Sequence, residues 1–325
     1  MFVAVGTVTR RAEARTASLP AMSALRVLPH VAAALAAGRP VVALESSVLA
    51  QGLPIPANRE AAERMTAAVE RAGAVPAVTA VVGGCCTLGL EPDELARFLL
   101  RAGVRKVAAR DLAVATAQGV DGATTVAASL CIAGAKDVPV FATGGIGGVH
   151  RDAPYDESGD LSELARTPIV VVCAGAKSIL DLGATLERLE TLGVTVVGYR
   201  TDELPGFFTR TTGLRLTARA DTPDELARIH LASRALKRTQ ATLVVQAPPA
   251  DVALPQDVVD EAVTAALDEA RHSGVRGAAV TPYLLAAVER ATGGRSLRTN
   301  LGLLEENAAL AGAIAVALTK EGVPR

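Results

Sequence analysis

One stretch of sequence decides the fold, namely Val170-Val171-Val172-Cys173-Ala174-Gly175-Ala176-Lys177-Ser178. The apolar run at its start is typical of a buried strand, and the small residues after it predict a turn. A lysine that is desolvated against apolar walls loses the charge that normally makes it inert, so Lys177 is a candidate amine nucleophile toward a carbonyl or sugar carbon. Taken alone, Lys177 also fits an ordinary surface lysine just past a strand.

Apolar strands alternate with amphipathic helices along the chain, which predicts an α/β fold whose sheet is covered on both faces. Strands are expected over residues 40–45, 78–84, 138–142, 169–173, 194–198 and 243–245. Helices are expected over 31–35 and 58–73, and from starting points near Pro92, Thr124, Ser178, Thr222, Gln256 and Asn300. No Ser/Gly linker divides residues 22–325, which are therefore expected to form a single catalytic domain.

Residues 1–21 show no convincing apolar period and carry several arginines, so they are expected to form a disordered arm. Met22 is then a candidate for the biological start of the chain. A cleaved targeting peptide is the competing interpretation, and Glu13 together with the lack of an apolar segment weakens it.

The composition argues against several classes of function. The 325 residues are 50% hydrophobic with a formal net charge of −1, which gives no electrostatic footprint for nucleic acid or an anionic membrane. Aromatic residues make up 2% and Trp is absent, so base-stacking platforms are not expected. No stretch reaches the roughly 18 uninterrupted apolar residues of a membrane helix. The expected partner is a small molecule, with no nucleic acid and no membrane.

The cysteines and histidines do not suggest a metal centre. Cys85, Cys86, Cys131 and Cys173 lie in apolar or Gly-rich surroundings without metal-ligand spacing. We interpret them as reduced and mostly buried, which favours a cytoplasmic protein. The four histidines are scattered, so a histidine-built metal site is not expected.

Polar groups follow several of the expected strands, where α/β sheets collect their ligands. The clearest case is Thr143-Gly144-Gly145-Ile146-Gly147-Gly148-Val149-His150-Arg151, whose glycines would let backbone N–H groups approach a phosphate closely. The run matches neither the Walker loop nor the Gly-x-Gly-x-x-Gly signature. A structural turn is an equally good interpretation of the glycines, and the adjacent His150 and Arg151 favour an anion site.

An acidic loop and two further charged residues complete the candidate site. Asp156-Glu157-Ser158-Gly159-Asp160 offers hard oxygen ligands suited to Mg²⁺ or Mn²⁺, and it equally fits a solvated loop in which Asp160 caps a helix. Glu45 ends an expected strand, where burial would raise its pKa and suit it to general acid catalysis, although such a residue is more often an ion-pair partner. Lys106 fits either a phosphate contact or an exposed charge.

Together these elements resemble the pseudouridine-5′-phosphate glycosidase family. The resemblance rests on residues 43–47, 52–58, 121–126, 141–151 and 173–181, which match in order along about residues 25–318. It implies a three-layer α/β/α fold around a mixed central β-sheet, a homotrimer and a bound Mn²⁺. It also implies reversible cleavage of the C–C glycosidic bond of pseudouridine 5′-phosphate by water, giving uracil and ribose 5-phosphate.

The resemblance also implies roles for individual residues. Lys177 would be the nucleophile, Glu45 the proton donor and Asp156 the metal ligand. The remaining matching positions would contact the substrate, as would the Gly-rich turn. These expected substrate contacts are Lys106, Val126, Thr143, Gly144, Gly145, His150, Ser158, Gly159, Asp160 and Asn300.

A lysine suits this reaction because the leaving atom is a uracil carbon, so protonating an oxygen alone, as ordinary glycosidases do, does not release it. If Glu45 protonates the ring oxygen while Lys177 attacks C1′, the ribose opens and an imine forms. Uracil departs once its C5 is protonated, and water then hydrolyses the imine.

Three positions depart from the family pattern and leave local contacts open. Gln51 stands where the family usually has His, Gln246-Ala247 lies where an Ala-Asn-Pro-type segment is usual, and Ala278 lacks the expected neighbouring lysine. The alternative functions are a lysine-imine aldolase acting on a sugar phosphate, a non-catalytic sugar-phosphate binder, and an indigoidine-type pigment-biosynthesis homologue. An aldolase would not need Glu45 and Asp156 in these contexts, and no eight-fold βα repeat is visible.

Overall fold

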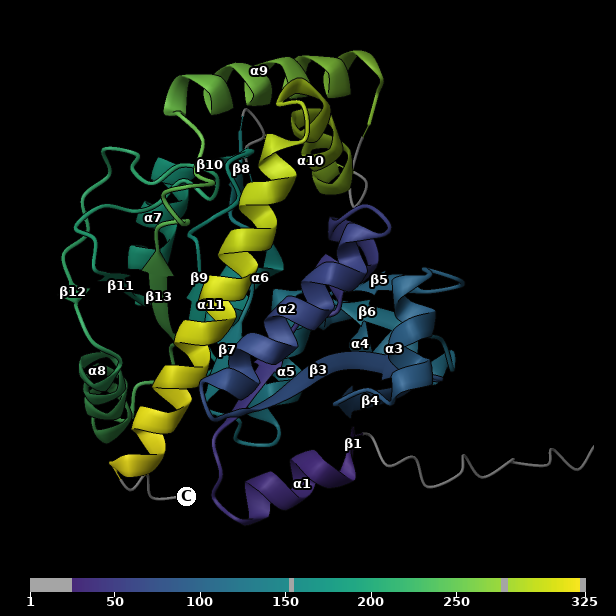
Figure 1. Ribbon diagram of the computed structural model, residues 1–325, viewed down its shortest axis with the longest axis vertical. Coiled ribbons are helices and arrows are strands. Elements are labelled where there is room, and N and C mark those ends of the chain that lie inside the picture. Colours follow the sequence, from purple (N-terminus) through teal and green to yellow (C-terminus); the bar gives the residue numbers. More distant parts are fainter. Residues whose placement is uncertain (1–24, 152–154, 276–279, 322–325) are drawn as a thin grey trace, which may run out of the picture.

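The architecture is that of a computed structural model, which describes residues 25–151, 155–275 and 280–321 (Figure 1). The arm expected over residues 1–21, and Ala278 among the departures noted above, lie outside the described residues.

A mixed sheet of 11 strands forms the centre of the molecule. Its main path runs in the order β1-β4-β3-β2-β7-β9-β13-β11-β12, and β5 and β6 join it through β3. Most neighbours pair in parallel, whereas β3 pairs antiparallel with β4 and β6. The strands are β1 (Leu25–Val27), β2 (Val41–Leu44), β3 (Val75–Val82), β4 (Cys85–Leu88), β5 (Arg105–Val107), β6 (Gly122–Thr124), β7 (Val140–Ala142), β9 (Val170–Cys173), β11 (Thr195–Tyr199), β12 (Arg219–Ala220) and β13 (Thr242–Gln246).

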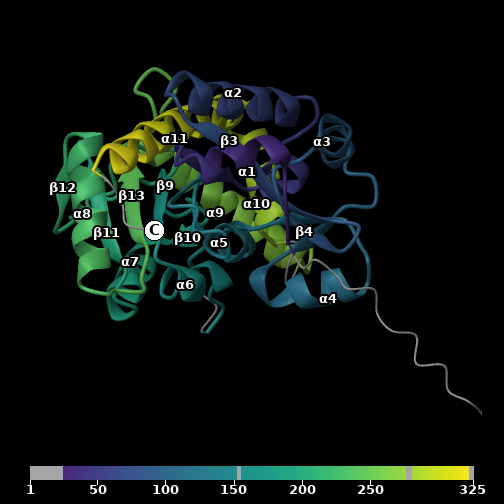
Figure 2. The same ribbon diagram turned by 90° about the horizontal axis from the view of Figure 1, so that it is seen from below.

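Helices cover both faces of this sheet, which confirms the three-layer α/β/α expectation (Figure 2). In that view α2 (Ala57–Arg71) and α11 (Arg295–Lys320) lie on one side, and α5 (Val126–Gly134), α6 (Gly159–Leu164) and α7 (Leu182–Thr191) on the other. The other helices are α1 (Pro29–Ala36), α3 (Pro92–Leu99), α4 (Leu112–Ala117), α8 (Pro223–Ala235), α9 (Gln256–His272) and α10 (Val280–Ala291), with short turns η1 (Val48–Gly52) and η2 (Ala109–Asp111).

The central strands are fully buried because helices cover both of their faces. Every residue of β2, β7, β9 and β13 is buried, as expected for parallel strands between two helical layers. The stretch that decides the fold therefore behaves as expected, with β9 at Val170–Cys173 in the middle of the sheet between β7 and β13.

Several element boundaries differ from the expectation for identifiable reasons. Helix α7 begins at Leu182 rather than near Ser178, because β10 (Leu180–Asp181) first pairs with β8 (Val149–His150) and Asp181 then caps the helix. Helix α2 spans Ala57–Arg71 instead of residues 58–73, and the Asn58 amide donates to the carbonyls of Leu49 (3.0 Å) and Leu99 (2.8 Å). Helix α11 begins at Arg295, and helix α10 was not expected.

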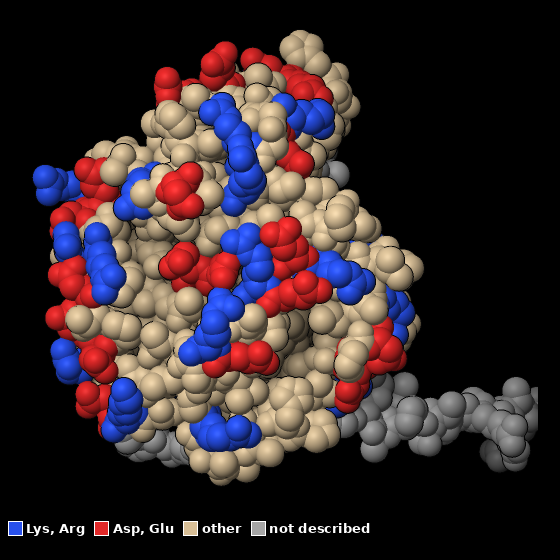
Figure 3. Space-filling view, in the orientation of Figure 1, with Lys and Arg blue, Asp and Glu red and all other residues tan. Residues whose placement is uncertain are grey.

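Helix α11 is long and apolar enough to span a membrane by length and composition alone, with a mean hydropathy of 1.5 in its most apolar window. However, 72% of that window is buried inside the protein, against the sheet and α2. Its apolar surface is thus used as core. On its exposed side Glu305 accepts from Arg64 (2.7 Å) and Arg71 (2.8 Å) of α2. Acidic and basic side chains are intermixed on the face of the molecule seen in Figure 3.

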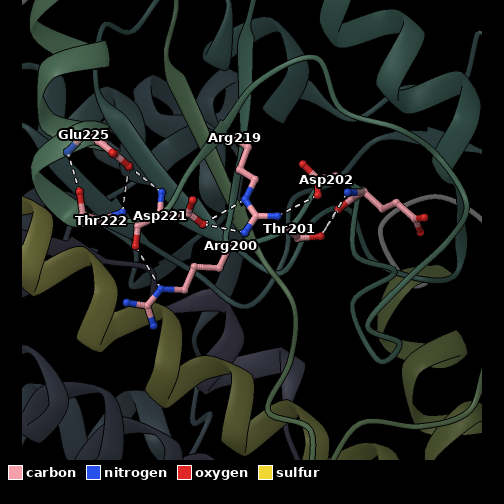
Figure 4. Close-up of polar contacts among 8 residues, drawn as sticks. Arg200, Thr201, Asp202, Arg219, Asp221, Thr222 and Glu225 are labelled. Carbon is pink, nitrogen blue, oxygen red and sulfur yellow. Dashed lines mark hydrogen bonds and ion pairs between the residues drawn. The ribbon is translucent and has the colours of Figure 1, made fainter.

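Charged residues also close the outer edge of the sheet at β12 (Figure 4). Arg219 pairs with Asp202 and Asp221, each at 2.8 Å, and Thr222 accepts a hydrogen bond from the backbone N–H of Glu225 at the start of α8. Short, charged edge strands resist pairing with other chains.

Candidate active site

A cavity of about 470 Å³ lies at the ends of β2, β7 and β9. The residues that follow these strands meet there with the first turns of α5 and α6, at the sheet edge where ligands of α/β proteins usually bind. The cavity brings together every site residue expected from the sequence except Thr143, and these are Glu45, Lys106, Val126, Gly144, Gly145, His150, Asp156, Ser158, Gly159, Asp160, Lys177 and Asn300.

Glu45 follows β2 directly, so the buried strand carries its carboxyl group to the floor of the cavity. The residue is only 5% exposed, and Thr143 donates its hydroxyl to Glu45 Oε1 at 2.7 Å. Burial raises the pKa of Glu45, and the positive charge of Lys177 and the Thr143 hydrogen bond oppose this effect. Because desolvation dominates, Glu45 keeps its proton to higher pH than an exposed glutamate, as a general acid requires.

Lys177 is positioned by a turn that packs against the glycine-rich turn after β7. Backbone hydrogen bonds run from Ala174 N to Gly144 O (2.9 Å), from Ile146 N to Gly175 O (3.1 Å) and from Lys177 N to Ile146 O (3.1 Å). Gly175 has a φ of +86°, a left-handed conformation that favours glycine.

The Lys177 side chain is half-buried, and Nζ donates to Gly145 O at 2.6 Å. Glycine is needed at 145 because a Cβ there would lie 2.6 Å from the ring of Phe207. The Lys177 side chain therefore lines the cavity, whereas the competing interpretation was an ordinary surface lysine.

Four charged groups interact around this point. Burial lowers the pKa of Lys106, and the positive charge of Lys177 lowers it further, while Glu45 and Asp160 oppose the shift. Two amines and two carboxyl groups thus share one partly desolvated space. Such an arrangement is typical of sites that transfer protons.

Asp160 connects three segments of the site. Its Oδ1 accepts from Ala127 N (2.9 Å) in α5, and its Oδ2 accepts from Gly147 N (2.8 Å) in the glycine-rich turn. Ser158 caps α6 and accepts from Asp160 N at 3.2 Å. The sequence suggested that Asp160 itself caps this helix, but the structure assigns that role to Ser158.

Val126 begins α5 and Gly159 begins α6, so both contribute first-turn backbone N–H groups, which have no partner within a helix. His150 lies in β8 and Asn300 in the second turn of α11. Thr143 is fully buried and does not line the cavity, because its hydroxyl donates to Glu45. It therefore holds the acid instead of offering its side chain to a substrate.

Asp156 is the residue of this loop that best suits a metal. It is exposed and lines the cavity, whereas the neighbouring Glu157 pairs with Arg188 at 2.9 Å. Within residues 25–151, 155–275 and 280–321, no group of three or more His, Cys, Asp or Glu side chains could hold a metal ion. Asp156 fits a hard cation that keeps most of its waters, but not a closed site of zinc type.

Sequence reasoning gave no role to two further polar groups at the cavity. Gln51 lies in the π-helical turn η1, and Thr125 precedes α5. Both line the cavity, and Gln51 Oε1 and Thr125 Oγ1 are buried without a hydrogen-bond partner in the part of the chain that the structure describes. The departure at Gln51 was the only signal available, since π-helical turns have no clear sequence signature.

The chain is similar to known proteins over most of its length. The model of the family described as indigoidine synthase A like protein matches residues 30–317. A pseudouridine-5′-phosphate glycosidase of Gemmatimonas aurantiaca is 64% identical over 92% of this chain and 97% of its own length. One of Herpetosiphon aurantiacus is 49% identical over 91% of this chain and 99% of its own length.

Two solved structures share the fold. The prealnumycin C-glycosynthase AlnA, in complex with ribulose 5-phosphate, has a TM-score of 0.85 and 39% identity, covering 92% of this chain and 98% of its own. An indigoidine synthase A-like protein of Thermotoga maritima has a TM-score of 0.83 and 34% identity, covering 91% and 96%.

Proposed function

The chain belongs to the family of indigoidine synthase A like proteins, and from this premise we propose that it is a pseudouridine-5′-phosphate glycosidase. Its reaction is the reversible cleavage of the C–C glycosidic bond of pseudouridine 5′-phosphate with water, which gives uracil and ribose 5-phosphate. The observation that supports this function best is the pairing of a buried acid, Glu45, with the enclosed amine of Lys177 at one cavity.

The first step uses both groups. The free amine of Lys177 attacks C1′, the bond from C1′ to the ring oxygen breaks, and the ring oxygen takes a proton from Glu45. Glu45 suits this step because burial raises its pKa. Thr143 keeps the carboxyl group in place through its 2.7 Å hydrogen bond.

Attack leaves Nζ as a secondary ammonium, so in the second step it first gives a proton to the Glu45 carboxylate formed in step one. The Nζ lone pair then expels uracil as its C5 takes a proton, which leaves an imine between C1′ and Lys177. Water then adds to C1′, and the amine departs with a proton to release ribose 5-phosphate. Lys106 and Asp160 lie close enough to interact with Glu45 electrostatically, so they are the charged groups available to assist these proton movements.

We propose that Asp156 would hold Mn²⁺, with water filling the other ligand positions. An exposed carboxylate at the cavity supports this assignment. When bound, the metal would supply positive charge against the phosphate and order water there. We also propose that the protein is a homotrimer and acts in the cytoplasm. Light scattering of the purified protein tests the trimer.

A sugar-phosphate aldolase is the second candidate, since it would use the same amine. Both reactions can use an acid beside the lysine, so the choice rests on the relatives, which are pseudouridine-5′-phosphate glycosidases at 64% and 49% identity. A non-catalytic binder would need neither group.

The deciding experiment is to incubate the purified protein with pseudouridine 5′-phosphate and Mn²⁺ and to follow uracil by chromatography. Uracil and ribose 5-phosphate should appear in equal amounts, and both should be absent with Lys177→Ala. If the wild-type protein forms no uracil but splits other phosphorylated sugars, the aldolase is the correct assignment.

A further inference from the structure

We propose that Asn307 is a positioning residue for the acid and the nucleophile, and that Gln246 keeps its side-chain amide in the required orientation. This inference rests on the proposed function, because it assigns the pair a part in that reaction. Neither residue lines the cavity, so both act through the segment Thr143–Gly145.

That short segment connects the two reacting side chains. At one end the Thr143 hydroxyl donates to Glu45 at 2.7 Å, and at the other the Gly145 carbonyl accepts from Lys177 Nζ at 2.6 Å. Any displacement of the segment therefore moves the partner of the acid and the partner of the amine together.

Asn307 holds the middle of the segment from α11. Its Nδ2 donates to Thr143 O at 2.8 Å and to Gly144 O at 3.3 Å, and its Oδ1 accepts from Gln246 Nε2 at 2.9 Å. Asn307 is 1% exposed, so an unmade hydrogen bond here would not be replaced by bulk water. Two carbonyl acceptors on one side and a donor on the other fix which way the amide points.

The segment has little room to adjust by itself. A Cβ at Gly144 would lie 3.2 Å from Leu304 and 3.3 Å from Leu303 of the same helix. Closely packed interiors transmit such displacements instead of absorbing them. Reaction geometry depends on sub-ångström placement of the reacting groups, so loosening this contact should slow the chemistry more than it weakens substrate binding.

The test compares Asn307→Ala and Gln246→Met with a matched control, Thr242→Val. Thr242 begins the strand that Gln246 ends, and its hydroxyl lies 3.1 Å from His230 Nδ1 in a buried pair outside the cavity. Loss of the Thr242 hydroxyl should lower the melting temperature and leave kcat within about twofold of wild type, as expected for an independent site.

Asn307→Ala should lower kcat by roughly tenfold to a hundredfold while KM changes by less than about threefold. Gln246→Met should also lower kcat, but by a smaller factor, because the Asn307 amide still contacts the segment. The high-pH limb of the rate profile should also move upward in Asn307→Ala. The substitution should displace Thr143, whose hydrogen bond lowers the pKa of Glu45, so this pKa should rise. The charged groups that act on Glu45, namely Lys177, Asp160 and Lys106, are unchanged.

A folded Asn307→Ala protein with wild-type kcat overturns the inference, and so does a fall in kcat that only matches the loss of folded protein. If Asn307→Ala does not fold, Gln246→Met decides by the same criteria. If wild type releases no uracil, the proposed function fails separately. The inference is then judged on borohydride trapping of ribose 5-phosphate at Lys177, which Asn307→Ala should slow and Thr242→Val should not.

Discussion

Replacing Glu45 with glutamine should abolish most of the activity and make the protein more stable. In the wild-type protein Thr143 donates to Glu45 Oε1 at 2.7 Å. The Gln side chain has nearly the same size and keeps a carbonyl oxygen that can accept this hydrogen bond. It has no acidic proton for the ring oxygen. Turnover should fall roughly a hundredfold or more, which corresponds to about 2.7 kcal/mol in the barrier, while substrate affinity is retained.

The stability effect follows from the raised pKa of Glu45, whose ordinary value is 4.5. Below that value the carboxyl is protonated in both the folded and unfolded states. As the pH rises, the unfolded chain ionises first and gains solvation that the folded state lacks, so wild type loses stability until the pH passes the folded-state pKa. Gln does not ionise, so the variant should gain an advantage that grows from about pH 4.5 upward.

The assay measures single-turnover cleavage, substrate affinity and melting temperature of both proteins across a pH series. Each kcal/mol of difference should appear as about 1–2 °C in the melting temperature of a chain this long. Near-normal cleavage by Glu45→Gln would refute the acid assignment. Lost binding with intact chemistry would make Glu45 a substrate-positioning residue, and a stability difference independent of pH would refute the linkage argument.

Three further predictions concern other parts of the chain. Borohydride added with ribose 5-phosphate should fix the sugar phosphate to Lys177, and labelling that persists in Lys177→Ala would exclude this lysine; Lys177→Arg should be equally inactive because guanidinium stays protonated. Chelation should remove most turnover and Mn²⁺ should restore it better than Ca²⁺, whereas full activity of metal-free Asp156→Ala would contradict the metal assignment. Deletion of residues 1–21 should leave turnover unchanged, and a large fall in melting temperature on deletion would show that the arm packs against the body.

The central layer of this fold could be predicted because its strands carry an unambiguous pattern. Fully apolar runs such as Val170–Cys173 are buried on both faces, and each is followed by a polar or glycine-rich turn at the same sheet edge. The first and last residues of the helices were harder to predict. Leu180–Asp181 pairs with β8 before α7 begins, and this non-local pairing leaves no signal in the helical period.

The two side chains that we propose to react could be predicted from the sequence, but the residues that position them could not. Lys177 and Glu45 stand at strand ends within recognisable motifs. Asn307 looks like an ordinary polar position in a helix, since its partners are the main-chain carbonyls of Thr143 and Gly144, more than 150 positions earlier in the chain. Nothing in a helical period indicates which backbone carbonyls a side chain will meet, so this contact required coordinates.

The position of α11 has a consequence for when the protein becomes active. Translation produces the chain from its amino terminus, and early segments begin to fold while later ones are still being made. The amine of Lys177 and the carboxyl of Glu45 thus exist in the growing chain before Asn300 and Asn307, which arrive with the last long helix, Arg295–Lys320. We therefore expect a chain that ends before Arg295 to be inactive, because it would lack Asn300, Asn307 and the buried surface that α11 contributes to the core.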